Sequence, residues 1–404
     1  SKITWRRVVV DEAQVIKNYQ SDTARELRRL QAHSRMALTG TPVENGLGDL
    51  WAILDFTNPG LVGPRNAFIE NLSRNTGSNG SNNSGANGNG NGASNGSNGS
   101  AGAGQAQTPA RATEESALRA LNGLLIFRRT KLEPEIAAEL PDKVDKMEHC
   151  PMTAEQIGLY QAVIDRLLAG GLEGDSNARK GQVLAAITAL KQICDHPAAY
   201  LREDDDNDTL AGRSGKLARL EELVGDVFAN GERILIFTHF ARWGERMAAY
   251  LTERTGMKIG CYHGGLARTV RDSLVEEFQS GTGPGALVLS IKAGGSGLNL
   301  TAANHVVLYD RWWNPAVEDQ ARDRAWRIGQ DKTVMSHRFV CPGTVDEKVE
   351  EIVAGKRKVA GMVLPARSSL GDLDADQLRS VLGLREDELV EDEPSEESGQ
   401  EVAA

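Results

Sequence analysis

A stretch near the carboxyl end of the chain carries side chains suited to gripping phosphate. Gln320, Arg324 and Arg327 are spaced at i, i+4 and i+7, so a helix through them would present two guanidinium groups on one face. Such groups bind phosphate oxygens in a bidentate manner. A solvated helix flank in which Asp323 pairs with an arginine would show the same spacing. The spacing alone leaves both interpretations open.

A second candidate site follows the run of valines at 8–10. These valines lead into Asp11 and Glu12, which predicts a buried parallel strand that ends at a site, because ligands in open α/β sheets lie beyond the carboxyl ends of strands. Asp11 could hold a magnesium ion, and Glu12 could orient or deprotonate an attacking water. Adjacent acids are common, so the prediction rests on this strand and on a second one, 35–38, that leads into the hydroxyl-rich turn 39–42.

Two more stretches follow apolar runs in the second half. Ser290 to Leu300 places glycines directly after a strand, where they permit close approach of a ligand, although an ordinary strand-to-helix turn has the same glycines. Trp312 and Trp313 fit either the core or a groove that binds a nucleic-acid strand. His263 is interpreted as a turn histidine without an acid–base role.

A P-loop is absent from the sequence, because Gly-Lys is nowhere followed by Ser or Thr.

The elements that must position these side chains alternate regularly in the second half. Helices separate apolar runs of strand length, which predicts a mostly parallel α/β sheet with helices on both faces. The predicted strands are 234–237, 259–262, 286–289, 305–309 and 334–340, and the predicted helices are 217–228, 245–251 and 270–278. In the first half we expect a helix at 50–56 and helices within 151–200 that could bridge two halves.

Length and composition indicate a globular protein. A chain of 404 residues, 40% hydrophobic and 25% charged, is long enough for about two to three domains. No run of eighteen apolar residues occurs and the first residues are not a signal sequence, so we expect a cytoplasmic protein that neither spans a membrane nor is secreted. The four cysteines show no CxxC pairing, which favours reduced, mostly buried thiols over a zinc site or disulfides.

Several segments lack the composition of a packed domain. Residues 75–110 contain no charged residue and are almost entirely Asn, Gly, Ser and Ala, which predicts a disordered insertion. The acidic run 203–208 predicts an exposed loop, and the tail from Glu386 onward holds nine carboxylates and no Lys or Arg. Without these nine, the formal net charge of −10 becomes −1, so global charge neither supports nor excludes a nucleic-acid partner.

Taken together, these stretches resemble the Swi/Snf-type ATPases of helicase superfamily two, in particular their bacterial members. The resemblance runs from Trp5 to about Leu364, interrupted by the insertion, and the motifs occur in the family's order. The similar segments are Asp11–Gln14 (motif II), Leu38–Asn45 (motif III), Phe127–Lys131 (end of lobe one), Ile234–Phe240 (motif IV), Tyr262–Gly265 (a DNA-contacting segment), Ser290–Leu300 with Asp310–Pro315 (motif V) and Gln320–Gln330 (motif VI).

This resemblance implies a DNA-dependent ATPase that uses ATP and Mg²⁺ between two RecA-like lobes. It implies that Asp11 and Glu12 bind magnesium and activate water, and that Arg324 and Arg327 are arginine fingers that reach the γ-phosphate from lobe two. The remaining positions fall on the nucleotide side, namely Gln14, Gly297, Asn299 and Gln320, or on the DNA side, namely Thr238, His263, Ser290, Lys292 and Trp313.

The resemblance also implies a domain organisation. The expected parts are 1–74 (partial lobe one), 75–110 (insertion), 111–148 (end of lobe one), 149–212 (helical bridge), 213–364 (complete lobe two) and 365–404 (acidic tail). Because the sequence starts at motif II, the phosphate-binding Lys loop is missing from it, and we expect the chain alone to hydrolyse ATP poorly. Trp326 stands where many relatives carry histidine, which should alter the packing around the two arginines.

The expected partner is double-stranded DNA, along which family members move without separating strands, with a nucleoprotein or polymerase as a further partner. Two alternatives stay open: a non-hydrolytic DNA-binding or protein-interaction module derived from such an enzyme, and an RNA-directed superfamily-two helicase. A Gly-Lys-Thr or Gly-Lys-Ser loop upstream would favour a truncated enzyme. Comparing the stimulation of ATP hydrolysis by duplex DNA, single strands and RNA would separate a DNA translocase from an RNA-directed helicase.

Overall fold

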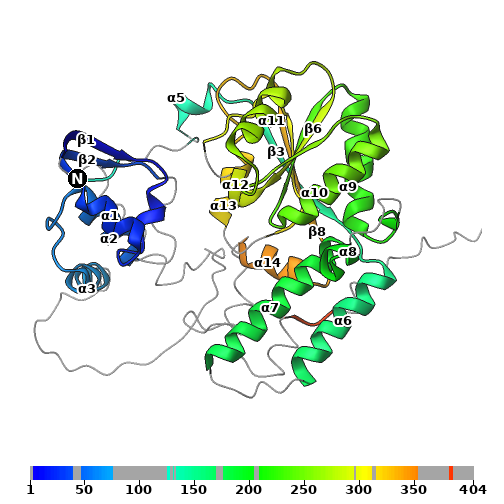
Figure 1. The fold of residues 1–404 in the computed structure, drawn as a ribbon, viewed down its shortest axis with the longest axis horizontal. Helices are drawn as coiled ribbons and strands as arrows, with labels where there is room; N and C mark the ends of the chain where they lie inside the picture. The colour runs from blue at the N-terminus through cyan, green and yellow to red at the C-terminus, as the bar shows by residue number, and fades with distance from the viewer. Residues whose placement is uncertain are drawn as a thin grey trace, which may run out of the picture. The chain divides into compact units, whose positions relative to one another are not determined.

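The structure is a computed structural model of the 404-residue chain (Figure 1). It describes residues 3–39, 47–75, 125–127, 131, 133–169, 176–203, 209–294, 297–311, 315–353 and 382–384. These residues form two compact units, which we call unit 1 (Ser1–Glu133) and unit 2 (Pro134–Ala404). Most of the predicted insertion and of the predicted acidic tail lies outside the described residues. None of the described helices is both long and apolar enough to cross a membrane.

Unit 1 is built on two parallel strands, as the valine run and the 35–38 run predict. They pair in register from Thr4 with Gln31 to Val10 with Ala37. The elements of this unit are β1 (Thr4–Val10), the 3₁₀ helix η1 (Ala13–Ile16), α1 (Asp22–Arg29), β2 (Gln31–Ala37), α2 (Leu47–Thr57) and α3 (Arg65–Asn75). The Ser21 hydroxyl caps α1 by accepting a hydrogen bond from the Ala24 N–H at 3.2 Å.

The core of unit 1 covers only part of this sheet. The buried residues that pack with the strands are Val10, Ala13, Ile16, Ala24 and Phe56, and a second small cluster on α2 and α3 holds Leu50, Leu54 and Phe68. By contrast, Trp5, Val9 and Met36 on the two strands are 47%, 55% and 56% exposed. Large apolar side chains of the strands therefore face solvent, and the prediction of a buried strand at 8–10 is wrong except at Val10.

Unit 2 contains a six-stranded, all-parallel sheet with the order β3-β8-β7-β4-β6-β5. The strands are β3 (Lys143–His149), β4 (Arg233–Thr238), β5 (Gly260–Tyr262), β6 (Gly285–Ser290), β7 (His305–Leu308) and β8 (Val334–Val340). The helices are α5 (Pro134–Ala137), α6 (Ala154–Ala169), α7 (Ser176–Asp195), α8 (Pro197–Leu201), α9 (Gly215–Ala229), α10 (Ala241–Thr255), α11 (Arg268–Ser280), α12 (Ile291–Gly294), α13 (Pro315–Arg322) and α14 (Val345–Val353). The parallel α/β sheet predicted for the second half is confirmed.

Both faces of this sheet are covered, because successive strand side chains point to opposite faces. In β4, Ile234 and Ile236 pack in one core cluster with α9 and α10. Leu235 and Phe237 pack in another, which also contains residues of α11 and α13. Figure 1 shows these two helix pairs on either side of the strands. A continuous apolar run such as 234–237 is therefore explained by burial on both faces.

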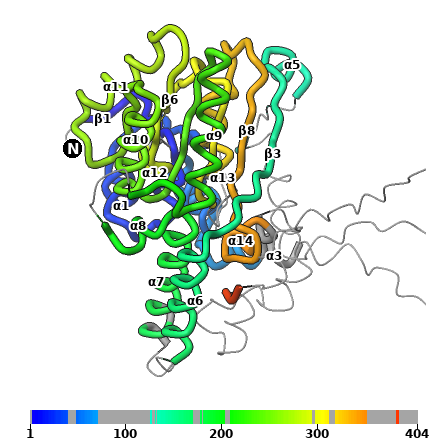
Figure 2. Tube along the Cα trace, turned by 90° about the vertical axis from the view of Figure 1, so that its right-hand side faces the viewer, coloured from blue at the N-terminus to red at the C-terminus, as the bar shows by residue number. Residues whose placement is uncertain are grey.

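Strand β3 corrects one predicted boundary. The sequence interpretation placed 111–148 at the end of lobe one, but β3 pairs in register with β8 as the edge strand of the unit 2 sheet, and unit 2 begins at Pro134 (Figure 2). Most residues of β3 are exposed or half-buried, because an edge strand has a neighbour on one side only. The strand was not predicted because charged residues interrupt its sequence, so it contains no apolar run.

Helices α6 and α7 form a hairpin, seen in both views (Figures 1 and 2). The helices predicted within 151–200 are confirmed, and Tyr160, Val163 and Ile164 of α6 are buried in one cluster with α7 residues. The Tyr160 hydroxyl accepts a hydrogen bond from the Val345 N–H and donates one to the Leu382 carbonyl, each at 2.9 Å. The hairpin is thereby connected to the start of α14.

Four fully buried ionisable side chains join this hairpin to α9 and α14. Lys216 Nζ on α9 lies 3.0 Å from Asp195 Oδ1 on α7 and 2.5 Å from Asp346 Oδ2 on α14. Lys191 Nζ lies 3.2 Å from Asp346 Oδ1. Burial alone would lower the pKa of Lys216, but Asp346 and Asp195 raise it well above its ordinary value. These ion pairs hold three helices in one arrangement.

All four cysteines are free thiols, as expected. Cys150, Cys194 and Cys341 are buried, and Cys261 is half-buried. The potential ligand atoms of Cys194, Cys341 and Asp346 lie within 4.8 Å of one another. Two lysine ammonium groups already contact Asp346, so positive charge there disfavours a bound cation.

Candidate functional site

The acidic pair follows directly on β1, and its geometry is unusual. Glu12 has φ of 50° and ψ of 51°, a left-handed conformation that is uncommon for a residue with a β-carbon. Its N–H donates to Asp11 Oδ1 at 2.9 Å, and Gln14 Nε2 donates to Glu12 Oε2 at 2.7 Å. Asp11 is exposed and Glu12 is half-buried. The backbone turn therefore aims two carboxylates in directions set by local hydrogen bonds.

A hydrogen-bond relay connects this pair to the end of β2. The Leu38 N–H donates to the Val10 carbonyl, and the Ala13 N–H donates to the Leu38 carbonyl, each at 2.8 Å. The Thr39 hydroxyl donates to Gln14 Oε1 at 2.8 Å, so Gln14 accepts from Thr39 and donates to Glu12. Gln14, which the resemblance placed on the nucleotide side, is therefore also the link between the turn that begins at Thr39 and the acidic pair. Residues 40–46 lie outside the described residues.

The segment Gln320–Gln330, which we call the arginine segment, corrects another prediction. Helix α13 ends at Arg322, so Arg324 and Arg327 do not share a helix face with Gln320 and lie instead in the turns that follow. The two guanidinium groups nevertheless converge, because Nη1 of Arg324 and Nη1 of Arg327 donate to the Leu298 carbonyl at 3.4 and 3.5 Å. Tertiary contact with the segment after β6 brings together what helical spacing was expected to align.

The two arginines differ in accessibility. Arg324 is 6% exposed, and its backbone carbonyl accepts a hydrogen bond from the Leu300 N–H at 3.0 Å. Arg327 is exposed, as are Gly297 and Asn299, and Gly297 has a positive φ of 57°. The predicted nucleotide-side positions of unit 2 therefore lie next to the arginine segment, with Arg327 open to solvent.

A buried arginine that the sequence analysis did not single out positions α13. Arg311 is fully buried just after β7, and it donates to both carboxylate oxygens of Glu318 on α13, at 3.0 and 2.9 Å. Its third contact is an ion pair with Glu350 on α14, which also binds Arg338 on β8 at 2.7 Å. Bidentate geometry of this kind fixes orientation as well as distance. The signal in the sequence was a charged pair, Asp310 and Arg311, directly after an apolar strand.

Trp326 packs against the entry to β3. Its indole Nε1 donates to the Pro141 carbonyl at 2.8 Å, and Lys143 Nζ lies 4.8 Å from the centre of its ring. A second contact with β3 comes from Arg322, whose Nη1 donates to Asp145 Oδ1 at 2.8 Å. The arginine segment is therefore anchored to the edge strand.

Asp310 organises the carboxyl end of β4. It is fully buried and accepts hydrogen bonds from the Thr238 hydroxyl at 2.6 Å, from the His239 N–H at 2.9 Å and from the His239 imidazole. Burial would raise the pKa of Asp310, but the charge and hydrogen bonds of His239 and the Thr238 hydroxyl lower it to about 2. Asp310 is thus an ionised, buried acceptor.

The predicted DNA-side residues differ in exposure. Thr238 is fully buried with its hydroxyl directed to Asp310, and its register partner Ser290 is 6% exposed. Lys292 on α12 is exposed. His263 Nε2 lies 2.8 Å from Glu245 Oε1, while its Nδ1 accepts from the Gly265 N–H at 3.2 Å. Trp312, Trp313 and Asn314 lie outside the described residues, so no contact of Trp313 is described.

For Thr238, burial removes direct access to a ligand. In this structure its side chain acts on Asp310, and a DNA contact from its hydroxyl would require the hydrogen bond to Asp310 to break. The roles predicted for Ser290, Lys292 and His263 stay predictions, with Lys292 the most accessible of the three.

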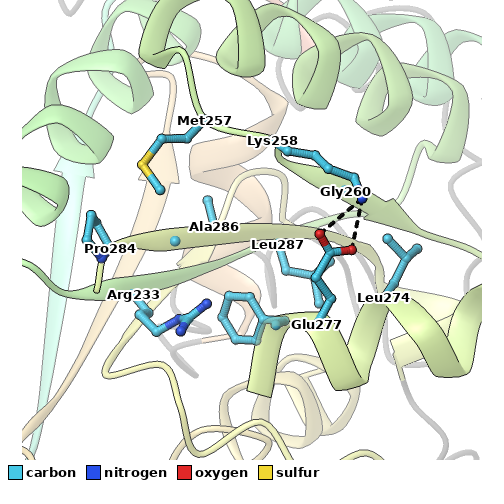
Figure 3. A pocket seen from close by; sticks show the side chains of 11 residues that line it. Arg233, Met257, Lys258, Gly260, Leu274, Glu277, Pro284, Ala286 and Leu287 are labelled. Atoms are coloured by element: carbon cyan, nitrogen blue, oxygen red, sulfur yellow. Dashed lines mark hydrogen bonds and ion pairs between the residues drawn. The ribbon is translucent and has the colours of Figure 1, made fainter. Parts of the chain in front are cut away.

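A small cavity lies at the amino edge of the unit 2 sheet, where β4 and β6 begin (Figure 3). Its volume is about 180 Å³. The Arg233 guanidinium lies 4.8 Å from the centre of the Phe278 ring, and Lys258 forms an ion pair with Glu277 at 2.9 Å. None of the predicted site residues lines this cavity. The predicted site residues of unit 2 that the structure describes instead lie at or after the carboxyl ends of its strands, as expected for a parallel α/β fold.

Comparison with known proteins identifies the family. Residues 1–199 match the SNF2-related domain, and residues 215–329 match the helicase conserved C-terminal domain. The chain is 37% identical over 384 residues to the "Putative ATP-dependent helicase/translocase YwqA" of Bacillus subtilis (strain 168), which covers 95% of this chain and 38% of that protein. It is 29% identical over 368 residues to the human "DNA excision repair protein ERCC-6", covering 86% of this chain and 23% of that protein. The chain therefore spans less than half the length of these relatives.

Solved structures agree in fold and sequence. The Sulfolobus solfataricus SWI2/SNF2 ATPase core in complex with double-stranded DNA is 32% identical, with a TM-score of 0.51, and the match covers 95% of this chain and 74% of that chain. The C-terminal domain of the Sulfolobus solfataricus SWI2/SNF2 ATPase is also 32% identical, with a TM-score of 0.50, over 60% of this chain and all of that one. The order of the motifs, the parallel sheets and these matches agree: the chain belongs to the Swi/Snf-type ATPases of helicase superfamily two.

Proposed function

We propose that this chain is part of an ATP-dependent translocase that moves along double-stranded DNA, and that residues of both units act on ATP. The observation that carries the proposal is the relay from Thr39 through Gln14 to Glu12, which holds a carboxylate in a strained turn at the end of a strand. Strain of this kind is kept where the orientation of a group matters. Membership of an ATP-dependent helicase and translocase family supports the assignment.

The acidic pair fits a magnesium–nucleotide complex. Asp11 and Glu12 supply carboxylate oxygens, which are the ligands that Mg²⁺ prefers, and Asp11 is exposed beyond the end of β1. Bound Mg²⁺ would neutralise charge on the β- and γ-phosphates. Glu12, oriented by Gln14, positions the attacking water and accepts its proton.

The arginine segment supplies positive charge for the γ-phosphate. Arg327 is exposed and can reach a phosphate without breaking a buried contact, whereas Arg324 is 6% exposed and supports the segment at 297–300. We assign both to stabilising the charge that develops on the transferred phosphate, with Gln320, Gly297 and Asn299 on the same nucleotide side. Lys292, His263, Ser290 and Trp313 are assigned to the DNA side, and Thr238 is assigned the role of holding Asp310 beneath that side.

The sequence contains no Gly-Lys-Ser or Gly-Lys-Thr, so this chain alone should hydrolyse ATP poorly. This feature also favours the second candidate, a non-hydrolytic DNA-binding module. The test is ATP turnover of the purified 404-residue chain with duplex DNA, single strands or RNA. We expect turnover close to the protein-free blank with all three. Robust duplex-stimulated turnover that disappears in Glu12→Gln would contradict the expectation and identify a competent enzyme.

The arginine assignment is tested in a form of the protein in which a P-loop accompanies this chain. Arg327→Ala should lower kcat by about 10³-fold, the effect of removing an arginine finger, while circular dichroism stays unchanged. The matched control is Arg268→Ala, which removes an exposed arginine from α11 that pairs with Asp272 at 3.6 Å. Full turnover in Arg327→Ala would show that the assignment is wrong, and stronger stimulation by RNA than by duplex DNA would favour an RNA-directed helicase.

A further inference from the structure

Two histidines on neighbouring strands meet near the amino edge of the unit 2 sheet. His305 begins β7 and His337 lies on β8, and Nδ1 of His305 is 3.3 Å from Nε2 of His337. We call these two residues the histidine pair. Their side chains are 13% and 5% exposed, so the pair lies just below the surface. None of the residues assigned above to the nucleotide or DNA side belongs to it.

The two rings point their inner nitrogen atoms straight at each other. The ring planes are 13° apart, and the ring centres are 5.6 Å apart. This separation is close to the N···N distance plus the short distance from each nitrogen to its own ring centre, so the two lone-pair directions lie along one line. A zinc ion held by both rings would need these directions to meet at a tetrahedral angle. The geometry therefore fits a hydrogen bond between the rings rather than a shared metal ion.

Each outer nitrogen of the pair contacts a carboxylate. His305 Nε2 lies 2.8 Å from Oε2 of Glu232, in the turn before β4, and His337 Nδ1 lies 3.1 Å from Oε1 of Glu148 on β3. Burial would raise the pKa of both carboxyl groups, but hydrogen bonds from basic neighbours, the two histidines among them, lower it below the ordinary value. An ionised carboxylate only accepts hydrogen bonds, so each outer nitrogen carries a proton.

The inner nitrogens are satisfied in one protonation state only. If both histidines are neutral, two lone pairs face each other across 3.3 Å, and if both are charged, two N–H groups do. With one proton between the rings, one inner nitrogen donates to the other. The arrangement therefore fits three protons on four nitrogens, which gives the histidine pair a single positive charge.

This charge belongs on His305. Its contact with Glu232 is shorter than that of His337 with Glu148, and its side chain is the more exposed of the two. Burial lowers the pKa of His337, and the charge of His305 lowers it further, although the hydrogen bond to Glu148 opposes both effects. His337 is therefore the neutral ring that accepts the hydrogen bond from His305.

The charged groups around the pair oppose a second positive charge on it. Lys332 Nζ, ahead of β8, lies 3.3 Å from Oε1 of Glu232. Glu148 is bound by Lys146 on β3 at 2.9 Å and by Arg219 on α9 at 3.3 Å. Three cations thus share the two carboxylates that face the histidines. They keep these carboxylates ionised and add to the positive charge around the histidine pair.

The arginine segment returns to the sheet beside this pair. Gln330, its last residue, donates through Nε2 to the carbonyls of Thr301 and Ala303, at 3.0 and 2.7 Å. Ala303 lies two residues before His305. A repulsion between the two histidines would therefore act next to the contact that holds the end of the arginine segment.

We propose that the histidine pair is a pH-sensitive contact between β7 and β8, formed by one shared proton and broken when acid adds a second positive charge. The second charge sets two N–H groups against each other at the amino edge of the sheet, beside the anchor of Gln330. The proton count rests on the geometry of the pair and not on the proposed function.

The sign of the pH effect follows from His337. Its pKa in the folded chain lies below the ordinary value of about 6.5. The stability that depends on its neutral form is therefore present above about pH 6.5 and is lost as the pH falls toward the folded-state pKa.

The first measurement follows the side-chain nitrogens of the 404-residue chain by NMR, with isotope-labelled histidine. The pair should titrate in two steps, and between them His305 should carry two protons and His337 one. His305→Gln should raise the titration midpoint of His337 by about one pH unit, because the charge that faces it is removed. His149→Gln is the matched control, since His149 is exposed and lies on the face of β3 opposite to Glu148, and it should leave this midpoint unchanged.

Two outcomes of this measurement overturn the proposal. One is a midpoint of His337 that is the same in the parent and in His305→Gln. The other is a parent in which the two histidines titrate independently, and this outcome is read from the parent alone, so it does not depend on how well a variant folds.

The second measurement is peptide-resolved hydrogen exchange. In the parent and in His149→Gln, the protection factors of β7, β8 and the peptide that contains Gln330 should fall by roughly ten-fold between about pH 7 and about pH 5. In His305→Gln they should fall by less than about two-fold, because no second charge faces His337. An equal fall in all three proteins would contradict the proposal. Neither measurement uses ATP or DNA, so a failure of the proposed function leaves both tests intact.

Discussion

Parallel strands are used differently in the two units. In unit 2, every residue of β6 is buried between β4 and β5, and helices cover both faces of the sheet. In unit 1, Val10 is the one buried residue of β1, and the sheet has two strands. Parallel sheets are usually covered on both faces, because both are apolar. Unit 2 satisfies this requirement within the described residues, and unit 1 does not.

This difference bears on how the two halves of the proposed chemistry are held. Arg324 and the segment at 297–300 belong to a unit with extensive cores of its own. Glu12 belongs to a unit with a small core, and local hydrogen bonds set its orientation. We infer that unit 2 is the more stable unit and that unit 1 gains stability from any additional surface that covers its strands.

The largest effect should come from the core of unit 2. Phe237→Ala removes a fully buried ring from β4 and should lower the free energy of unfolding of unit 2 by about 3–5 kcal/mol. Peptide-resolved hydrogen exchange in increasing urea reports this unit separately. A loss below about 1 kcal/mol would mean that the sheet is less tightly packed than its burial indicates.

Breaking the buried ion pairs should cost slightly less. Asp346→Asn removes the negative charge from a side chain that contacts both Lys191 and Lys216, which should destabilise unit 2 by about 3 kcal/mol. Exchange of α7 and α14 peptides should increase. Asp272→Asn on the surface of α11 is the control and should change stability by less than about 0.5 kcal/mol, as expected for an exposed pair.

The pH dependence of unit 2 should include a contribution from Asp310. The pKa of this carboxyl group is about 2 in the folded chain and about 3.9 in an unfolded one. Its stabilising contribution, on the order of 2 kcal/mol, is therefore present above about pH 4 and is lost as the pH falls toward about 2. The stability of Asp310→Asn should fall less steeply over this range. Equal slopes for parent and variant would show that Asp310 does not contribute.

The smallest effect should come from the exposed face of unit 1. Val9→Ala, at a side chain that is 55% exposed, should change the stability of unit 1 by less than about 0.5 kcal/mol. The comparison with Phe237→Ala is direct, because both variants shorten an apolar side chain on a parallel strand. A loss near 2 kcal/mol would mean that Val9 is covered in solution, and the contrast between the units would then be smaller than described.

Much of the fold could be predicted because burial leaves a pattern in the sequence. The runs 234–237 and 286–289 are continuously apolar, and both became central strands. Strand β3 was missed because, at the edge of a sheet, Lys143 and Asp145 remain compatible with solvent and no apolar run forms. The relay through Gln14 was missed for another reason: its partner Thr39 follows the other strand of the unit 1 sheet, and pairing between strands is not visible in local spacing.

The sequence by itself determined the order of strands and helices along the chain, the family, and the residue types available for chemistry, since local periodicity and motif order are properties of neighbours in sequence. Only the tertiary structure decided which of those residues meet. Arg324 and Arg327 converge on the Leu298 carbonyl although α13 ends at Arg322 and neither arginine belongs to that helix. Such convergence depends on strand order and on the packing of helices against the sheet, which bring together groups that are distant along the chain.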